Sequence, residues 1–336
     1  MDRGKRVLVS VIISTYNSAK FIEGRLKNLV EQTIFEDIEI VIINSGSRQN
    51  EEEILQKYLK IHSNIKYIRT EDRETIYKAW NRGIKVAKGE FITNGNTDDR
   101  LRKDALEILS NYLQKYSNLA LVYADQYIVK SAEDYEKNEN LIGEYIRPDY
   151  SPLQLCYQYF AGSQSMWRSS LHYTEDIWFD DAFEVAGDYD FITKVALRHD
   201  IRHIKEKLGY YYMSPKQSNK EFQNINRTVR ETIRIQESFT HQYINSLEFA
   251  ERNKLLKRLN CFQALPSRGY SLIKKISDRF FKNWILPTRI YMTYLISVIL
   301  ESQREIDKAL KICLKYEDNK YAYILHDQIS RLKKGE

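Results

Sequence analysis

Two adjacent carboxylates, Asp98 and Asp99, follow the short apolar run Glu90–Thr93. Neighbouring carboxylates repel each other, and a divalent cation relieves that repulsion. Such cations bind substrate phosphates through one or two carboxylates together with the phosphate oxygens. The pair therefore indicates a cation and a phosphate ligand. An Asp in front of the helix-like segment 100–113 is equally typical of a helix N-cap, so both interpretations stay open.

A third carboxylate, Asp188, lies in the segment Ala186-Gly187-Asp188-Tyr189-Asp190. A carboxylate within hydrogen-bond reach of a substrate hydroxyl can take its proton and so make that hydroxyl a nucleophile. The residues alone favour another interpretation, in which Asp188 and Asp190 cap a helix over 191–198.

The elements that would position these carboxylates alternate between two patterns. Short β-branched, apolar runs predict buried strands at 7–14, 38–43, 65–68, 90–93 and 119–123. Apolar residues at helical spacing predict helices around 21–30, 54–61, 75–87 and 104–116.

This alternation predicts an α/β domain with βαβ units and a mostly parallel sheet. Ligands of such sheets lie beyond the carboxyl ends of the strands. The polar turns Thr15–Ser18, Asn44–Ser47 and Asn94–Asp99 fall at those ends, so we expect the site there.

The rest of the chain has other patterns. The polar, Tyr-rich segment 131–150 predicts a loop or a small edge hairpin, and the pattern is helical from about Thr228 onward. We therefore expect a nucleotide-binding domain over 1–225 and a helical C-terminal domain over 226–336.

Composition is that of a globular protein: 43% of the 336 residues are hydrophobic and 29% are charged. The cysteines Cys156, Cys261 and Cys313 stand far apart, which excludes a disulfide framework and favours a reducing compartment. The longest apolar segment, Trp284–Leu300, is interrupted by Pro287 and Arg289 and is shorter than the roughly 20 residues that span a bilayer. We expect a cytoplasmic protein.

Positive charge gathers in the C-terminal part, where residues 220–336 hold 22 Lys and Arg against 13 Asp and Glu. A solvated basic helix surface is the favoured interpretation, and we expect no nucleic-acid partner. The aromatic residues Phe280, Phe281 and Trp284 among these basic residues leave peripheral membrane contact open as an alternative.

The chain from residue 7 to 99 resembles family 2 glycosyltransferases of the GT-A fold. The resemblance rests on the ordered motifs VSVIISTYNSAKFI, QTIFEDIEIVIINSGS, AWNRGIKVAKGEFI and NTDDR. It extends more loosely through Gly162–Leu171 and Phe179–Phe191.

On the donor side, the resemblance implies a uracil and ribose pocket lined by Thr15, Tyr16 and Asn17. Asp98 would bond the ribose, and Arg73 would contact the base or a phosphate. Asp99 would bind Mn²⁺ or Mg²⁺ at the diphosphate. The family often has two acidic residues where Asn44 and Ser45 stand, so Ser45 is expected to bond the base without strict uridine selectivity.

On the acceptor side, the resemblance implies that Asp188 is the catalytic base. Gly162, Ser163 and Gln164 would lie where the acceptor enters. Trp167 would contact it through its ring, with a core aromatic as an equal alternative. Many relatives carry a metal-binding His about 25 residues after the base. Here Gly209–Pro215 contains none, so no third protein ligand is expected.

The expected function is an inverting, metal-dependent transfer of a sugar, by best guess N-acetylglucosamine, from a UDP-sugar to an acceptor hydroxyl. The acceptor would be a cell-surface glycan, a lipid-linked glycan, or a Ser or Thr of a surface protein such as flagellin. The alternative is a non-catalytic nucleotide-sugar-binding module. A nucleotidyltransferase is less favoured, because Ser14–Lys20 lacks a Gly-rich basic phosphate loop.

Overall fold

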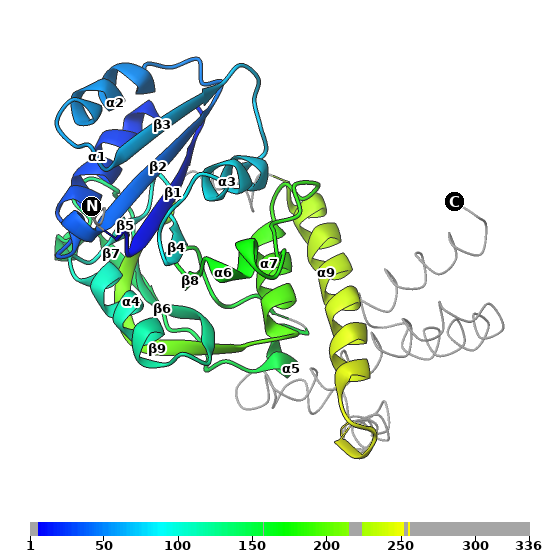
Figure 1. Cartoon of the computed structure of the whole chain (residues 1–336). Coiled ribbons are helices and arrows are strands. Elements are labelled where there is room, and N and C mark those ends of the chain that lie inside the picture. Colours follow the sequence, from blue (N-terminus) through cyan, green and yellow to red (C-terminus); the bar gives the residue numbers. More distant parts are fainter. Residues whose placement is uncertain (1–5, 157, 215–223, 252–254, 256–336) are drawn as a thin grey trace, which may run out of the picture. The chain divides into compact units, whose positions relative to one another are not determined.

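Four parallel strands form the N-terminal half of the sheet. They are β1 (Val9–Thr15), β2 (Ile38–Ser45), β3 (Ile65–Thr70) and β4 (Phe91–Asn94). In the computed structural model, which describes residues 6–156, 158–214, 224–251 and 255, β1 lies between β2 and β4, and β3 pairs with β2 (Figure 1). All eight residues of β2 are buried, as expected for a parallel strand covered on both faces.

Helices cover both faces of these strands. They are α1 (Ala19–Val30), α2 (Glu51–Leu59), α3 (Ile76–Ile84) and α4 (Ala105–Lys115), with a 3-10 turn at Phe35–Asp37. Alternate residues of β1 contact the core that α1, α2 and α4 share, where Leu26, Leu55 and Leu109 are buried. On the other face α3 packs closely on β1. A Cβ added at Gly83 would lie 2.6 Å from Cγ2 of Ile12.

The second half of the sheet is mixed. Its strands are β5 (Arg100–Leu101), β6 (Leu119–Val129), β7 (Leu141–Tyr145), β8 (Met166–Arg168) and β9 (Asp200–Tyr212). The described order is β3-β2-β1-β4-β8-β6-β9-β5, with β7 paired to β6 off this path. β6 and β9 run parallel, whereas the pairings of β8 with β4 and of β5 with β9 are antiparallel.

The remaining described elements are a 3-10 turn at Asn138–Asn140 and the helices α5 (Pro152–Leu155), α6 (Ser170–Tyr173), α7 (Gly187–Ala196) and α9 (Ile225–Ser246). Contacts divide the chain into two compact units. One holds residues 1–151 and 159–232, and the other holds residues 152–158 and 233–336. The predicted division at residue 225 stays a prediction.

The α/β architecture and the four N-terminal strands agree with the sequence prediction, and β7 forms the edge hairpin expected in 131–150. The helix predicted over 104–116 is confirmed as α4, and only the alternative that started a helix at residue 100, behind Asp99, is wrong. Arg100 and Leu101 pair with β9, and the helix begins at Ala105. The long strand β9 was not predicted from the sequence. Its charged residues and register shifts obscure the alternation of apolar and polar residues that is typical of a strand.

None of the helices in the described part of the chain combines the length and apolar character that crossing a bilayer requires. The aromatic and basic residues around Phe280 lie outside the described residues.

Candidate active site

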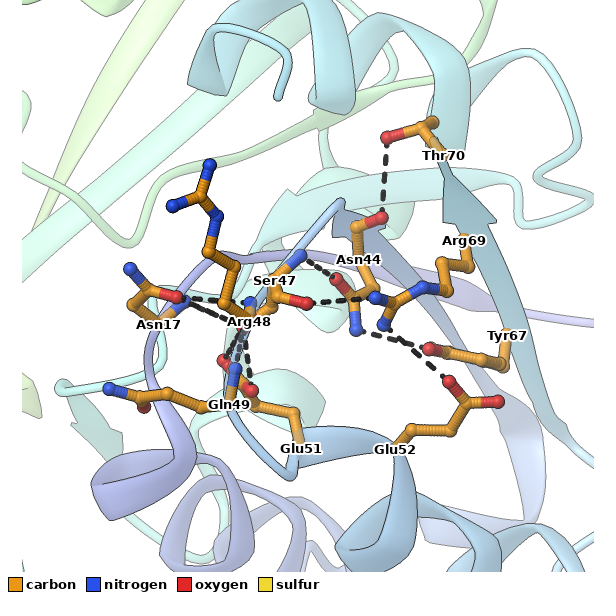
Figure 2. Close-up of polar contacts among 10 residues, drawn as sticks. All are labelled: Asn17, Asn44, Ser47, Arg48, Gln49, Glu51, Glu52, Tyr67, Arg69 and Thr70. Carbon is orange, nitrogen blue, oxygen red and sulfur yellow. Dashed lines mark hydrogen bonds and ion pairs between the residues drawn. The ribbon is translucent and has the colours of Figure 1, made fainter. Parts of the chain in front are cut away.

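Two polar turns meet where β1 and β2 end. Asn17 has a left-handed backbone with φ +52°, and its N–H donates to Oγ of Ser47 over 3.0 Å. Ser47 donates in turn to the fully buried carboxylate of Glu51 (Figure 2). The same carboxylate accepts the N–H of Ser18 at 2.7 Å. Glu51 thus holds both turns in one arrangement.

The β2 turn is fixed from the other side as well. Asn44 donates from its amide to the hydroxyl of Tyr67 and accepts the N–H of Ser47 at 2.8 Å (Figure 2). The guanidinium of Arg69 donates to the carbonyl of Ser47. Gly46 completes the turn with φ +64°, a conformation that glycine adopts without a steric cost.

The residues expected at the nucleotide surround these turns. Thr15 is fully buried, and its hydroxyl donates to Ser18. The guanidinium of Arg73 lies 4.4 Å from the ring centroid of Tyr16, as in a cation–π contact. Ser45 is 1% exposed, and its hydroxyl has no partner among the described residues. A buried hydroxyl without a partner carries a desolvation cost that a ligand could remove.

Asp99 lies at the next strand end, and its carboxylate is held by Asn96 of its own turn and by two distant segments. Oδ2 accepts from Ser163 at 2.8 Å and from Asn96 at 3.3 Å, and Oδ1 accepts the N–H of Tyr212 at 3.1 Å. Asp99 is 1% exposed, and this burial raises its pKa despite the three hydrogen bonds. The predicted helix-cap role of Asp99 is therefore wrong, since it precedes a strand and binds β9. Asp98 beside it is half-buried.

Two buried arginines lie under this turn. Arg25 of α1 and Arg100 both donate to the carbonyl of Asp99, at 3.3 and 2.8 Å. Burial, together with the charge of Arg100, lowers the pKa of Arg25 to about 10. Nε and Nη2 of Arg25 have no partner among the described residues. The turn therefore lies on a concentrated positive charge.

We tested whether these residues fit a divalent cation. No group of three or more His, Cys, Asp or Glu in the described part of the chain could hold a metal by itself. Oδ1 of Asp99 accepts the N–H of Tyr212 and has a second lone pair, so it can serve as one ligand. The site thus fits an ion that a diphosphate brings with it, as Mg²⁺ is often bound. Because Asp99 is almost fully covered, one of its present donors must move for the ion to reach it.

Asp188 lies in the first turn of α7 and accepts the N–H of Tyr189 at 2.9 Å. It does not cap a helix that begins at Phe191, because α7 already begins at Gly187. Two tyrosines approach its carboxylate. The hydroxyl of Tyr77 lies 3.5 Å from Oδ1. Burial, together with the nearby charge of Asp188, raises the pKa of Tyr159 well above its usual value.

The loop before Asp188 is held by Glu231 of α9. The Glu231 carboxylate accepts the N–H groups of Glu184, Val185 and Ala186 at 2.9 to 3.1 Å. Three converging N–H donors fix the main chain at the start of α7, and thereby the backbone that carries Asp188.

The expected acceptor-side residues lie between the two carboxylates. Gly162 has φ +77°, and its carbonyl accepts from Tyr159 at 2.7 Å. Ser163 contacts Asp99, and the buried Gln164 donates to the carbonyl of Arg100 at 3.2 Å. The segment 159–164 therefore contacts Asp99 through Ser163, and its Tyr159 lies near enough to Asp188 for that charge to help raise the tyrosine's pKa.

Trp167 is placed as a core aromatic, so its expected ring contact with the acceptor needs correction. It is 2% exposed and packs against Phe179 and Phe191. Its indole N–H donates to Nε2 of His172 at 2.7 Å. No face of the ring is left for an acceptor.

Sequence reasoning missed Arg25, Tyr159, Tyr212 and Glu231. Arg25 stands within the apolar stripe of α1, next to the fully buried Leu26, and a charge in such a stripe is a usable signal. The other three lie at the site because of tertiary contacts, which no local sequence pattern predicts.

Comparisons with known proteins bear on the family and the fold of the chain. The model of the family described as "Glycosyl transferase family 2" matches residues 10–173. A chondroitin synthase of Escherichia coli is 27% identical over 209 residues, which are 60% of this chain and 28% of that protein. The poly(ribitol-phosphate) β-N-acetylglucosaminyltransferase TarS of Staphylococcus aureus is 23% identical over 281 residues, 82% of this chain and 48% of that protein. The chain thus spans less than half of either relative.

Solved structures give the same result for the fold. The crystal structure of S. aureus TarS 1-349 superposes with a TM-score of 0.60 at 20% identity, over 98% of this chain and 92% of that one. Its complex with UDP-GlcNAc gives a TM-score of 0.54 at 19% identity, over 89% and 92% of the two chains. A mannosyltransferase from Pyrobaculum calidifontis, in complex with GDP-Man and Mn²⁺, gives 0.52 at 18% identity, over 88% and 87%. At these identities the likeness concerns the fold alone.

Proposed function

We propose that this chain, which has a GT-A fold and matches the family 2 glycosyltransferase model over residues 10–173, transfers N-acetylglucosamine from UDP-N-acetylglucosamine to an acceptor hydroxyl with inversion. The observation that carries the proposal is the buried carboxylate of Asp99, which lies at a strand end beside two arginines and accepts from Ser163. Asp188 supplies a second carboxylate in the first turn of α7, near the hydroxyl of Tyr77. The choice of donor is supported by the relative that is named a β-N-acetylglucosaminyltransferase.

On the donor side, Thr15, Tyr16, Asn17, Ser45 and Arg73 form the nucleotide pocket in this proposal. The Tyr16 ring stacks on the base, and the unpartnered hydroxyl of Ser45 bonds its polar edge. Asp98 bonds the ribose, and Asp99 holds a divalent cation at the diphosphate. When bound, that cation neutralises charge that develops on the leaving diphosphate.

On the acceptor side, Asp188 takes the proton of the attacking hydroxyl. That oxygen forms a bond to the anomeric carbon while the bond to the diphosphate oxygen breaks, and a single displacement of this kind inverts the anomeric centre. Gly162, Ser163 and Gln164 form the wall along which the acceptor enters. We propose a cell-surface glycan as the acceptor, with a surface-protein Ser or Thr as the alternative.

A turnover assay tests the proposal. Release of UDP from a panel of UDP-sugars is measured with Mn²⁺, with and without chelator. We expect chelator-sensitive turnover of UDP-N-acetylglucosamine. We also expect a loss of about 100-fold or more in Asp188→Asn, because a general base contributes roughly that much. Asp200→Asn, at an exposed strand end, is the matched control.

Different results would revise different parts. Full activity of Asp188→Asn would refute the base, and full activity in chelator would refute the cation. Tight binding of UDP without turnover of any donor, with every acceptor class tried, would favour the nucleotide-sugar-binding module. Failure of UDP to bind at all would refute the assignment of these residues to a donor site.

A further inference from the structure

The guanidinium of Arg147, two residues after β7, has no counter-ion in the described part of the chain. Nη2 donates to the amide oxygen of Gln126 at 2.8 Å, and Nε is buried without a partner. The ring of Tyr145 lies against the same guanidinium, with its centroid 4.5 Å from Cζ. Burial lowers the pKa of Arg147, so its charge is held there at a cost in free energy. Because charged side chains are seldom buried unless they are paired, this arginine indicates an anion from outside the chain.

Carboxylates on the neighbouring strands are bonded to other groups. Oδ1 of Asp125 on β6 accepts the main-chain N–H of Arg147 at 2.7 Å and lies 2.8 Å from Nε2 of His203. Glu144 on β7 pairs with Lys207 at 3.2 Å. Neither carboxylate forms an ion pair with the Arg147 guanidinium, so its charge is not neutralised within the sheet.

Gln126 adds a second donor without an acceptor. It is 2% exposed and lies opposite Tyr145 in the pairing of β6 with β7. Because a guanidinium can only donate, the amide oxygen faces Arg147 and the amide nitrogen keeps both its protons free. That nitrogen is buried and has no partner among the residues that the structure describes. Two adjacent side chains thus present N–H donors that an anion with several oxygen atoms would satisfy.

Gly162 places this pair of side chains on the acceptor side of the site. A Cβ at Gly162 would lie 2.9 Å from Nη2 of Arg147 and 3.1 Å from Oε1 of Gln126, so the main chain passes close to both. The next residue, Ser163, donates to Asp99. The pair therefore adjoins the segment along which the acceptor enters, whereas the nucleotide turns lie at the ends of β1 and β2.

We propose that Arg147 and Gln126 bind an anionic group of the acceptor, so that the acceptor is a polymer that carries phosphodiesters or carboxylates. This inference rests on the proposed function, in which the segment 162–164 forms the acceptor wall. A guanidinium binds two oxygens of either group through parallel N–H···O bonds. The half-buried position of Arg147 gives the anion access from solvent. A neutral acceptor would leave the charge unpaired.

Binding of two anionic oligomers to the full chain tests the proposal without turnover. One is a short poly(glycerol phosphate), which carries phosphodiesters, and the other is an oligogalacturonate of similar length, which carries carboxylates. Neutral maltohexaose is the reference. Titration calorimetry gives the Kd values for the wild type, Arg147→Gln and Arg202→Gln. Arg202 is the matched control, because Cζ of its guanidinium also lies close to a ring centroid, that of Tyr116 at 4.8 Å, and its loss changes the net charge equally.

We expect the wild type to bind one of the anionic oligomers more tightly than maltohexaose. Arg147→Gln should weaken that binding by about tenfold to 100-fold, the worth of hydrogen bonds to a charged group. Arg202→Gln should weaken it by less than about threefold, because the charge of an exposed side chain is screened by solvent. The oligomer that binds more tightly identifies the anion as phosphodiester or carboxylate. Equal Kd values in the wild type and Arg147→Gln, or binding of neither oligomer, would overturn the proposal.

Gln126→Glu supplies the missing counter-ion within the chain. The new carboxylate would stand where the amide now accepts from Nη2 of Arg147, and it would pair with the guanidinium. We expect the affinity for the anionic oligomer to fall by about tenfold or more, with a urea denaturation midpoint that shows a folded protein. Wild-type affinity in this variant would contradict the proposal.

A measurement on the unmutated chain guards against folding defects in the variants. In protein labelled with ¹⁵N-arginine, the Nε–H signal of Arg147 is the one lost in Arg147→Lys. It should move when the anionic oligomer is added and stay in place when UDP and Mn²⁺ are added. A signal that moves with UDP and Mn²⁺ but with neither oligomer would assign Arg147 to the donor and refute the acceptor role.

Turnover separates this inference from the proposed function. Binding of an oligomer through Arg147, without turnover of any UDP-sugar in its presence, would support the anion site and refute the proposed transfer. Consumption of UDP-N-acetylglucosamine with a neutral glycan as acceptor, while neither anionic oligomer binds, would support the transfer and refute the anion site alone.

Discussion

At Ser45, removal of the hydroxyl should affect the stability of the fold and the binding of UDP in opposite directions. The hydroxyl is buried and has no partner among the described residues, so it costs folding free energy unless a ligand bonds it. A hydroxyl kept for structure would have the opposite effect, since its removal would destabilise the fold.

Replacing Ser45 with Ala should therefore leave the free energy of unfolding unchanged or slightly raised. It should weaken UDP binding by about threefold to tenfold, the worth of one hydrogen bond. Urea denaturation and titration calorimetry measure the two quantities. Ser110→Ala is the control, because the buried Ser110 donates to Glu107 at 3.0 Å and should lose about 1 kcal/mol without a change in UDP affinity. A destabilised Ser45→Ala with normal affinity would count against a ligand role.

At the same scale, the sequence singles out Asp99 and Asp188 as site candidates only through the family resemblance, because each carboxylate alone is typical of a helix start. It does not single out their partners. Tyr212, Glu231 and Tyr159 lie up to 113 positions from the carboxylates or loops they contact, and only the folded sheet brings them there. Trp167 shows that a residue in a family motif can also be misassigned. The sequence was equally compatible with a core tryptophan and with one that contacts the acceptor.

The turn after β2 is the element whose geometry tolerates least change. Gly46 has φ +64°, and a Cβ there would lie 2.7 Å from the carbonyl oxygen of Glu71. Gly46→Ala should cost roughly 1 to 2 kcal/mol of unfolding free energy from the left-handed backbone alone. It should also weaken UDP binding, because the turn moves.

The control for that turn is Gly143→Ala in β7, where the added Cβ would make an ordinary contact of 3.4 Å with Ile128. It should change stability by only about half a kcal/mol. Equal effects of the two substitutions, measured by urea denaturation, would contradict the role given to the Gly46 turn.

The link between α9 and the Asp188 loop gives a second prediction at this scale. Glu231→Ala removes the acceptor of three N–H groups, so the loop before α7 should lose its fixed position. We expect kcat for UDP release to fall by about tenfold or more while the KM for the donor stays close to that of the wild type. Glu23→Gln, which affects one surface pair on α1, is the control. A rise in donor KM with unchanged kcat would place the effect of Glu231 elsewhere.

The sequence predicts strands where apolar residues form an uninterrupted run, and it misses strands where charged residues interrupt that run. The buried strands β1 to β4 consist largely of β-branched apolar residues, and they were identified together with their helices. β8 has three residues and β9 alternates irregularly with charged residues, so neither had a period to detect.

For the whole molecule, the buried His172 makes stability depend on pH. Burial lowers its pKa to about 4, from an ordinary value of about 6.5. As pH falls from about 6.5 toward 4, the His172 imidazole therefore binds a proton in the unfolded chain but stays neutral in the folded chain. The contribution of His172 to the free energy of unfolding is fully present above pH 6.5 and is lost as pH falls from 6.5 to 4. The loss amounts to at most roughly 3 kcal/mol.

His172→Gln should flatten this part of the stability profile. Glutamine offers an oxygen to the indole N–H of Trp167 but does not titrate in this range. The free energy of unfolding, measured by urea denaturation at pH 4.5 and 7, should differ less in the variant than in the wild type. His199→Gln is the control, since that ring is partly exposed. An identical slope in the wild type and His172→Gln would refute the assignment.

The order of the strands along the chain has a consequence for biosynthesis. The four parallel strands β1 to β4 are complete once residue 94 has left the ribosome, and domains tend to fold from the N-terminus as they emerge. The carboxylate of Asp99 still lacks Ser163 and Tyr212 at that stage, because both are synthesised later. A truncated nascent chain can thus assemble the four parallel strands and still lack the enclosure of Asp99, which requires translation through β9.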